Sequence, residues 1–326
     1  MELFFNNKPE TKADLKESVN YEKIYDTAIY GAGPAGLSAA LYTLRKNMKT
    51  ALISKDIGGQ VITTWDVENY PGFKKIGGYD LSKKMEEQIT QFPIALDEGV
   101  SLVKLEKKSV FEAHLDNGKV LKSKTVILAL GKKYQELGVK GEKKFTGKGV
   151  SYCSTCDAPL FKNKTTVVAG GGNAAAEALL ELSKIASKVY AVIRKEHFRA
   201  DPVLIQKIEE TKNIEILFNH SIQEISGNEF VEKVMIQKKD TNEVKTLETD
   251  AVFVEIGLVP NTSFECVPSL TINDQKEIRV NNKGETNIKG LFAAGDVTDI
   301  PEKQIVIAAG EGAKAALSAF RYLQNQ

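Results

Sequence analysis

The fold of this 326-residue chain is decided by one stretch, Ile24-Tyr25-Asp26-Thr27-Ala28-Ile29-Tyr30-Gly31-Ala32-Gly33-Pro34-Ala35-Gly36. The mostly apolar first half predicts a short buried strand, and Leu37, Ala40, Leu41 and Leu44 follow the glycines at helical spacing. A strand, a Gly-x-Gly-x-x-Gly turn and a helix, in this order, form the context in which such glycines bind a dinucleotide. The glycines permit a tight turn and let the backbone approach a pyrophosphate at the positive end of the helix. A glycine-rich turn between packed elements is the alternative, but the order favours a Rossmann-like domain.

A second unit of the same kind lies further along the chain. Thr165–Ala169 predicts a strand, Gly170–Ala175 supplies a Gly-x-Gly-x-x-Ala turn, and Ala176–Leu182 begins a helix. Two such units predict an α/β protein with two dinucleotide-binding domains.

The residues that end the second strand of each unit bear on which nucleotide is bound. In the second unit Lys188–Ile193 ends in Arg194-Lys195, and Arg199 is one short loop away. A carboxylate at this place would accept the ribose 2′-hydroxyl of NAD, whereas cations suit the 2′-phosphate of NADP. The cations favour NADPH, and a solvated basic edge is the alternative. In the first unit Ser54-Lys55 stand where the ribose-binding acid is expected, and Asp56 is offset from that position.

Between the two units lies a pair of cysteines, Cys153 and Cys156, followed directly by Asp157. A Cys-x-x-Cys pair can form a readily exchanged disulfide, contribute to a zinc site or be chemically inert. Zinc needs four protein ligands, or three and a water, and Cys266 is the remaining cysteine. The three histidines show no ligand spacing: His114, His197 and His220. The nucleotide motifs on both sides favour redox chemistry, and no metal site is predicted.

Composition excludes several classes of function. The chain is 42% hydrophobic and 27% charged, which is typical of a soluble globular protein. Its net charge of +1 argues against nucleic acid or anionic membrane as a partner. Phe4-Phe5 is followed at once by polar residues, unlike a secretory signal peptide. Three cysteines do not make a disulfide scaffold. We therefore expect a soluble cytoplasmic protein.

Other segments predict further elements. We expect a solvated extension over Met1–Lys23, with packing on a partner subunit as the alternative. A helix over about Leu81–Phe92 and a hairpin turn at Asn117-Gly118 are also expected. A buried strand over Thr125–Ala129 and a small-residue helix over Ala308–Phe320 complete the prediction.

Taken together, from about Tyr25 to Leu323, these segments resemble the low-molecular-weight thioredoxin reductases, a family of flavoproteins with two dinucleotide sites. The resemblance implies an FAD domain made of residues 1–132 and 250–326, with an NADPH domain, residues 133–249, inserted into it and carrying the cysteine pair. It also implies a three-layer arrangement in each domain and a homodimer.

The resemblance assigns residues to both cofactors. The segment Glu68-Asn69-Tyr70-Pro71-Gly72 is similar to a stretch that contacts FAD, Gly295-Asp296 to a flavin ribityl motif, and Gln304-Ile305-Val306 to the flavin-ring segment. The predicted FAD residues are Gly31, Gly33, Pro34, Ala35, Gly36, Gly59, Gln60, Asn69, Gly131, Gly295, Asp296, Gln304, Ile305 and Val306. The predicted NADPH residues are Gly170, Gly172, Asn173, Ala174, Ala175, Arg194, Lys195 and Arg199. The family commonly has His-Arg-Arg-x-x-x-Arg where this chain has Ile193-Arg194-Lys195 and Arg199.

Two segments, Ala158–Phe161 and the tail from Ala294 through Ala316, are also very similar to the flavoprotein subunit of alkyl hydroperoxide reductase. That subunit carries an additional N-terminal thioredoxin-like domain with its own cysteine pair. The extension before Ile24 is too short for such a domain and holds no cysteine. The relay is therefore expected to be a separate protein.

By analogy with the reductases, the chain is an NADPH-dependent thioredoxin-disulfide reductase. Electrons would pass from NADPH through FAD to the cysteine pair and then to a thioredoxin-like protein. Cys156 would face the flavin, Cys153 would attack the partner's disulfide, and Asp157 would move protons to and from the thiols, although a helix-capping role is the alternative. The disulfide must meet both the flavin and a bulky protein, so a rotation between the domains is expected.

Several alternatives stay open. The electron donor could be NADH or ferredoxin, and the acceptor could be thioredoxin, a glutaredoxin-like protein or a peroxiredoxin relay. A flavin-binding redox sensor would have no need of the apparent nicotinamide site. Relatives of ferredoxin-NADP reductase lack the cysteine pair, so Cys153 and Cys156 argue against that assignment.

Overall fold

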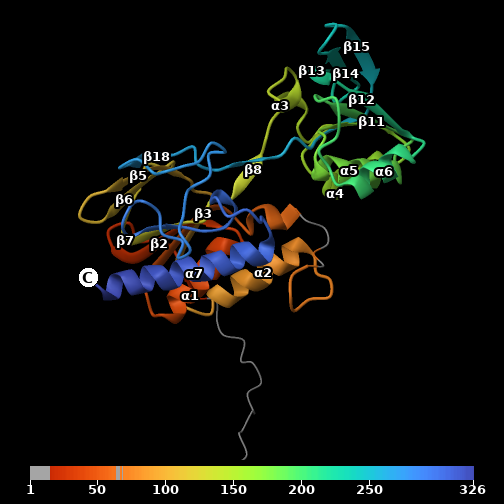
Figure 1. Ribbon diagram of the computed structural model, residues 1–326. Coiled ribbons are helices and arrows are strands. Elements are labelled where there is room, and N and C mark those ends of the chain that lie inside the picture. Colours follow the sequence, from red (N-terminus) through yellow and green to blue (C-terminus); the bar gives the residue numbers. More distant parts are fainter. Residues whose placement is uncertain (1–14, 64–66, 68) are drawn as a thin grey trace, which may run out of the picture. The chain divides into compact units, whose positions relative to one another are not determined.

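The computed structural model in Figure 1 describes residues 15–63, 67 and 69–326, and of Thr63, Thr155 and Cys156 it describes the backbone only. The chain forms two compact units. Unit 1 comprises Met1–Lys133 and Pro260–Gln326, and unit 2 comprises Tyr134–Val259. Unit 2 is thus inserted into a discontinuous unit 1.

The second boundary differs from the sequence expectation, which placed it after residue 249. The strand β16 (Ala251–Val254) pairs in parallel with β10 (Thr165–Ala169), so it belongs to the sheet of unit 2. The chain returns to unit 1 only after Val259. The chain passes from one unit to the other in two strands, β8 (Lys132–Tyr134) and β17 (Leu258–Pro260), and these strands pair with each other.

Unit 1 is built on a large sheet with the strand order β1-β4-β3-β2-β7-β6-β5-β18, and β19 also pairs with β7. The strands are β1 (Lys16–Glu17), β2 (Ile24–Ala32), β3 (Thr50–Ile57), β4 (Ile94–Glu98), β5 (Leu102–Lys107), β6 (Phe111–Leu115), β7 (Val120–Leu128), β18 (Glu265–Val267) and β19 (Leu291–Ala293). β7 pairs parallel with β2 over residues 122–128, antiparallel with β6 over residues 120–123, and parallel with β19 over residues 126–128. β7 therefore joins a parallel sheet to an antiparallel one. The predicted hairpin at Asn117-Gly118 is confirmed, with Gly118 at φ 79°.

Alternation along β2 explains the layers of unit 1. Ile29 packs with the helix residues Leu37 and Ala315, while its neighbours Ala28 and Tyr30 pack with Phe111 of the antiparallel strands. Successive side chains of a strand point to opposite faces, so both faces of β2 are buried. The helices α1 (Pro34–Arg45), α2 (Gly78–Ile89) and α7 (Ile305–Gln324) lie together in unit 1 (Figure 1). The predicted three-layer α/β architecture is confirmed.

Unit 2 repeats this plan around a parallel sheet of order β12-β11-β10-β16-β9. Val168 packs on the side of α5 (Asn173–Ser183) and α6 (Pro202–Glu209), and its neighbours Val167 and Ala169 pack on the side of an antiparallel sheet. The remaining strands are β9 (Val150–Ser151), β11 (Lys188–Ile193), β12 (Ile214–Phe218), β13 (His220–Ser226), β14 (Lys233–Lys238) and β15 (Val244–Glu248). The short helices are α3 (Glu142–Phe145), α4 (Ser154–Asp157) and η2 (Ala158–Phe161).

The expectation of a solvated extension over Met1–Lys23 is wrong for part of it. Residues 1–14 lie outside the described residues, but Lys16–Glu17 forms β1 and pairs in parallel with β4. Val19 is buried, and the Tyr21 hydroxyl donates a 2.6 Å hydrogen bond to Asp97. Backbone pairing with an edge strand holds a segment whose own sequence is weakly patterned.

Candidate functional site

The turn between β2 and α1 contains glycines of two kinds. A Cβ on Gly36 would lie 1.8 Å from the Gly31 carbonyl oxygen, and one on Gly31 would lie 2.2 Å from the Ala129 oxygen. These two glycines are therefore required by the packing of the chain itself. Gly33, which precedes the first turn of α1, is different: its nearest atom would be 3.9 Å away, and its φ of −73° suits any residue. The open space above Gly33 at a helix N-terminus fits a pyrophosphate.

A pair of substitutions tests this distinction. We expect Gly36→Ala to destabilise the fold by about 1–3 kcal/mol or more, because its Cβ would overlap backbone. Gly33→Ala should leave the unfolding temperature unchanged and weaken FAD binding about tenfold, equal to about 1.4 kcal/mol. Thermal unfolding of the flavin-free chain and titration with FAD measure the two effects. Equal FAD affinity in Gly33→Ala and the wild type would contradict the assignment.

The structure brings the residues predicted for FAD together in unit 1. They lie in the β2–α1 turn (Gly31, Gly33, Pro34, Ala35, Gly36), in η1, Gly59–Thr63 (Gly59, Gln60), at Asn69, after β7 (Gly131), in η3, Gly295–Val297 (Gly295, Asp296), and at the start of α7 (Gln304, Ile305, Val306). Glu68, quoted with them, lies outside the described residues. Asn69 donates a 3.1 Å hydrogen bond to the Gln304 side chain. A Cβ on Gly295 would lie 2.8 Å from that of Ala35. Segments far apart in sequence thus converge on one turn, and their role in FAD binding stays a prediction.

In the first nucleotide-binding unit, the residues at and near the position expected for a ribose-binding acid make hydrogen bonds within the protein. Ser54 Oγ accepts a 2.9 Å hydrogen bond from the Ala32 amide and donates one to the Asp56 carbonyl. The Asp56 carboxylate in turn accepts a 3.1 Å hydrogen bond from the Gly59 amide. Ser54 and Asp56 therefore hold the glycine turn and the start of η1 in place.

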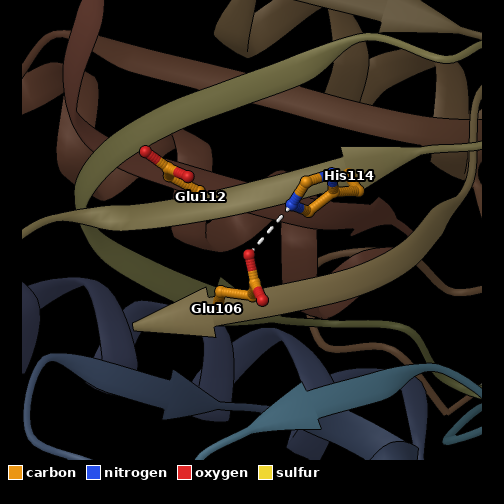
Figure 2. A group of neighbouring side chains, drawn as sticks. All are labelled: Glu106, Glu112 and His114. Atoms are coloured by element: carbon orange, nitrogen blue, oxygen red, sulfur yellow. Dashed lines mark hydrogen bonds and ion pairs between the residues drawn. The ribbon is translucent and has the colours of Figure 1, made fainter. Parts of the chain in front are cut away.

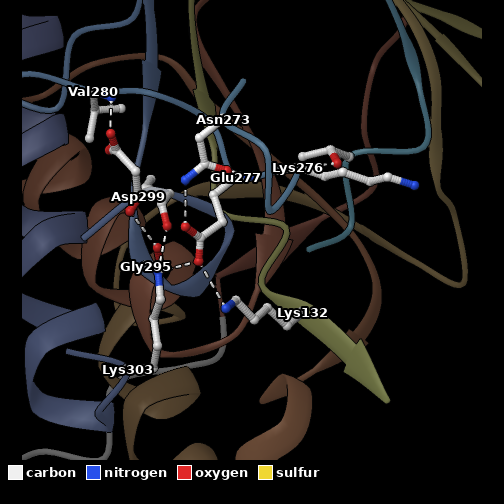
Figure 3. A network of polar contacts seen from close by, with 10 residues as sticks. Lys132, Asn273, Lys276, Glu277, Val280, Gly295, Asp299 and Lys303 are labelled. Carbon is white, nitrogen blue, oxygen red and sulfur yellow. Dashed lines mark hydrogen bonds and ion pairs between the residues drawn. The ribbon is translucent and has the colours of Figure 1, made fainter. Parts of the chain in front are cut away.

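A network that the sequence did not indicate lies beside Gly295 (Figure 3). The Glu277 carboxylate pairs with Lys132 at 3.0 Å and with Lys303 at 3.1 Å. Burial alone would raise the pKa of Glu277, but hydrogen bonds from Asn273 and both lysines outweigh it and lower the pKa to about 2. Burial also raises the pKa of Asp296, a shift that the two lysines oppose. The pairs span 145 and 26 positions of sequence, which is why periodicity could not reveal them.

The second glycine turn, between β10 and α5, repeats the pattern of the first. Gly170 has φ 149°, and a Cβ there would lie 2.1 Å from the Glu255 carbonyl oxygen, so packing requires this glycine. A Cβ on Gly172 would meet nothing within 4 Å. The space above Gly172 at the start of α5 fits a second pyrophosphate. Of the other residues predicted here, Asn173 accepts a 2.8 Å hydrogen bond from the Asp201 amide. Ala174 is exposed and Ala175 is buried.

The three cationic residues predicted near the end of β11 do not all lie in one place: Arg194 and Lys195 line a pocket, and Arg199 does not. Arg194 and Lys195 line a pocket of about 320 Å³ in unit 2, whose full lining is Arg194, Lys195, Asn219, His220, Ser221 and Lys239. Arg199 is held elsewhere: its amide donates a 2.7 Å hydrogen bond to the Gly171 carbonyl within the glycine turn. The turn between β12 and β13 and the end of β14 add residues that the sequence prediction missed. A pocket with three cationic side chains and hydroxyl and amide donors fits a phosphate group.

The cysteine segment lies in unit 2. The sulfur of Cys153 is disulfide-bonded, and its residue is half-buried directly before α4. Its backbone is tied to Ser151, whose hydroxyl accepts a 3.1 Å hydrogen bond from the Cys153 amide. The side chain of Cys156 lies outside the described residues. Asp157 ends α4 without capping η2, which leaves its carboxylate free of the capping role considered from sequence.

Cys266 differs in kind. It is a free thiol in unit 1, and burial raises its pKa to about 11. A protonated, half-buried thiol is a poor nucleophile, so we interpret Cys266 as an ordinary packed residue.

One group of potential metal ligands lies on the antiparallel strands of unit 1 (Figure 2). Ligand atoms of Glu106, Glu112 and His114 lie within 4.8 Å of one another, a grouping that the sequence spacing did not indicate. Both carboxylates are already paired with ammonium groups: Lys104, Lys108 and Lys122 lie 2.5–3.7 Å from them. A divalent ion would have to displace these lysines, so we interpret the cluster as a surface ion-pair network.

Comparisons with known proteins agree with this geometry. The model of the pyridine nucleotide-disulphide oxidoreductase family matches residues 25–312. A thioredoxin reductase structure from Lactococcus lactis is 32% identical, with a TM-score of 0.81 over 93% of this chain and 100% of that one. A Bacillus subtilis (strain 168) protein named NADH dehydrogenase is 41% identical over 92% of this chain and 58% of its own length. A subunit of alkyl hydroperoxide reductase from Pseudomonas putida is 39% identical over 94% of this chain and 60% of its own length.

Within the part of the chain that the structure describes, no helix combines the length and apolar character needed to cross a bilayer. The chain spans about three fifths of the length of the Bacillus subtilis and Pseudomonas putida relatives, and the whole of the Lactococcus lactis reductase. The chain therefore belongs to the pyridine nucleotide-disulphide oxidoreductase family, which implies a flavin and a nicotinamide nucleotide, and it has the fold of the low-molecular-weight thioredoxin reductases.

Proposed function

We propose that this protein is a flavin-dependent disulfide reductase that passes electrons from NADPH through FAD and the Cys153/Cys156 pair to thioredoxin or a thioredoxin-like protein. The observation that carries the proposal is the disulfide-bonded Cys153 in the unit that also holds an open glycine turn and a basic pocket. Structural cysteine pairs have no need of a nucleotide site beside them. A redox-active pair needs a source of electrons, which a nicotinamide nucleotide supplies.

Each unit would contribute a distinct part. The turn around Gly33 would hold the pyrophosphate of FAD, and the turn around Gly172 that of the nicotinamide nucleotide. Bound FAD would supply hydride acceptance from the nicotinamide and two-electron transfer to the disulfide. Cys153 would then attack the partner's disulfide, with Asp157 close in sequence to move protons. The predicted FAD residues and the cysteines lie in different units, so the proposal also includes the domain rotation expected from the family.

The donor is proposed to be NADPH because Arg194, Lys195 and Lys239 line one pocket. We expect Arg194→Ala combined with Lys195→Ala to lower kcat/KM for NADPH about tenfold to a hundredfold while kcat/KM for NADH changes little, because the 2′-phosphate loses charge-assisted hydrogen bonds. Steady-state kinetics with both nucleotides measure this. Lys188→Ala, at the start of β11 and paired with Glu215, is the matched control. A wild type that prefers NADH would favour the donor suggested by the name of the Bacillus subtilis relative.

The acceptor has two candidates, and an assay decides between them. The fold favours a thioredoxin-like protein, and the resemblance to a subunit of alkyl hydroperoxide reductase favours a peroxiredoxin. Nucleotide oxidation is followed with each oxidised candidate from the same genome. Turnover with thioredoxin alone supports the proposal, whereas turnover that requires a peroxiredoxin supports the second candidate. The homodimer expected from the family stays a prediction, checked by light scattering.

A further inference from the structure

A second carboxyl group lies beside the cysteine segment, on a different element from Asp157. Glu255 follows directly after β16, and its amide donates a 2.8 Å hydrogen bond to the Ala169 carbonyl. One oxygen of its carboxyl group, Oε1, lies 3.4 Å from the amide nitrogen of Ser154. Ser154 is the residue directly after Cys153 and the first residue of α4. The carboxyl group of Glu255 thus contacts the backbone on which the Cys153 sulfur is carried.

The surroundings of Glu255 favour its protonated form. Burial raises the pKa of Glu255 to about 7, the Ser154 amide opposes this shift, and the nearby carboxylates of Glu181 and Glu177 on α5 add to it. Among the described side chains of α4, Asp157 is the one that titrates. A carboxyl group that holds its proton near neutral pH is suited to donate it, because an acid is most effective when its pKa is close to the working pH.

We propose that Glu255 is the proton donor to Cys153 when the disulfide opens. The inference rests on the proposed function, since it requires that the pair be reduced in each cycle. A two-electron nucleophile (a hydride-level reductant in the proposed function, a thiolate in disulfide exchange) bonds to the other sulfur, the S–S bond breaks, and its electron pair stays on Cys153. The Cys153 sulfur takes the proton of the Glu255 carboxyl group, directly or through one water, and the carboxylate regains a proton from solvent. The transfer is downhill, because an ordinary thiol has a pKa of about 8.5.

The proposal assigns the two carboxyl groups to opposite ends of α4. Glu255 meets the helix at Ser154, beside the cysteine expected to act on the partner, and Asp157 ends the helix beside Cys156. One acid for each sulfur would allow each thiolate to be protonated where it forms.

The experiment makes Cys153 the sole cysteine of the chain and follows its departure as a thiol from a mixed disulfide. A Cys156→Ser/Cys266→Ser chain is converted to its mixed disulfide with glutathione, and dithiothreitol then releases Cys153. The release is followed by mass spectrometry from about pH 6 to about pH 8.5, with and without Glu255→Gln. We expect release to be about tenfold slower with Glu255→Gln at about pH 6, and the difference to vanish at about pH 8.5, where Glu255 has no proton to give. Glu209→Gln, which removes an exposed carboxylate of α6 that is not among the groups acting on the pKa of Glu255, should leave the profile unchanged.

Other outcomes overturn the proposal. A ratio of rates that is the same at every pH would mean that Glu255 acts only through packing, and Glu255→Ala provides a second test of this. Release that is faster in Glu255→Gln at high pH would mean that the carboxylate merely repels the thiolate. The assay uses neither flavin nor nicotinamide. The two proposals can therefore fail separately. If the release profile is as expected but NADPH does not reduce the disulfide of the wild-type chain, the proposed function is refuted and the role of Glu255 is not.

Discussion

Replacing Cys156 by serine is expected to abolish disulfide turnover while NADPH still reduces the bound flavin. Without the second sulfur the chain cannot form the intramolecular disulfide that accepts electrons from FAD, so steady-state reduction of a protein disulfide should fall at least about a thousandfold. The nucleotide and flavin sites belong to other segments and should be unaffected. Anaerobic stopped-flow absorbance of the flavin after mixing with NADPH measures the first half-reaction, and steady-state oxidation of NADPH measures the second.

Cys266→Ser is the matched control for this experiment. Because burial raises the pKa of Cys266 to about 11, that thiol is protonated at neutral pH and should contribute nothing to turnover. Disulfide turnover that survived in Cys156→Ser would refute the role of the pair. Loss of turnover in Cys266→Ser would show that the electron path includes a third sulfur.

The second large effect concerns stability and the network around Glu277. Glu277→Gln removes the carboxylate that pairs with both Lys132 and Lys303, whose side chains are 13% and 21% exposed. Two largely buried ammonium groups would then lose the carboxylate that contacts them. Breaking a fully buried pair costs about 3–5 kcal/mol, so we expect a loss of about 2 kcal/mol in the free energy of unfolding at neutral pH. Urea unfolding of the flavin-free chain measures it.

The stabilising contribution of Glu277 is expected to fall as the pH is lowered. Glu277 has a folded pKa of about 2, below its ordinary value of 4.5, so its stabilising contribution is present above about pH 4.5 and is lost as the pH falls through about 2. The difference between wild type and Glu277→Gln should therefore shrink steadily below about pH 4.5. Glu265→Gln is the control, because Glu265 is 62% exposed and pairs with Lys104 at 3.4 Å. It should change stability by less than about 0.5 kcal/mol. A difference for Glu277→Gln that did not depend on pH would contradict the ion-pair explanation.

Short-range sequence patterns were sufficient to predict the turns, strands and helices that depend on neighbouring residues. The two glycine turns, the strands before them and the helices after them could be located because each is a short-range pattern of spacing. The helix predicted over Leu81–Phe92 is observed as Gly78–Ile89, and the one over Ala308–Phe320 as Ile305–Gln324. Their ends were less certain than their existence, since helix ends depend on packing as well as on sequence.

Contacts between distant segments were beyond such patterns. Glu255 was visible only as a polar residue at the end of an apolar strand, and its partner Ser154 is 101 positions away. The boundary of unit 2 was misplaced for the same reason, because the pairing of β16 with β10 depends on which strands become neighbours in the sheet. His114 had no ligand spacing in sequence, yet β5 and β6 place it beside two glutamates.

The amino-acid sequence by itself determined where the nucleotide turns, the cysteine pair and the main helices lie, because turn conformation and amphipathic spacing are set within a few residues. Tertiary structure alone decided which glycines are needed for packing and which leave open space, which lysines share Glu277, and which carboxyl group reaches α4. Those choices depend on strand order and register, which bring together side chains that no local pattern relates.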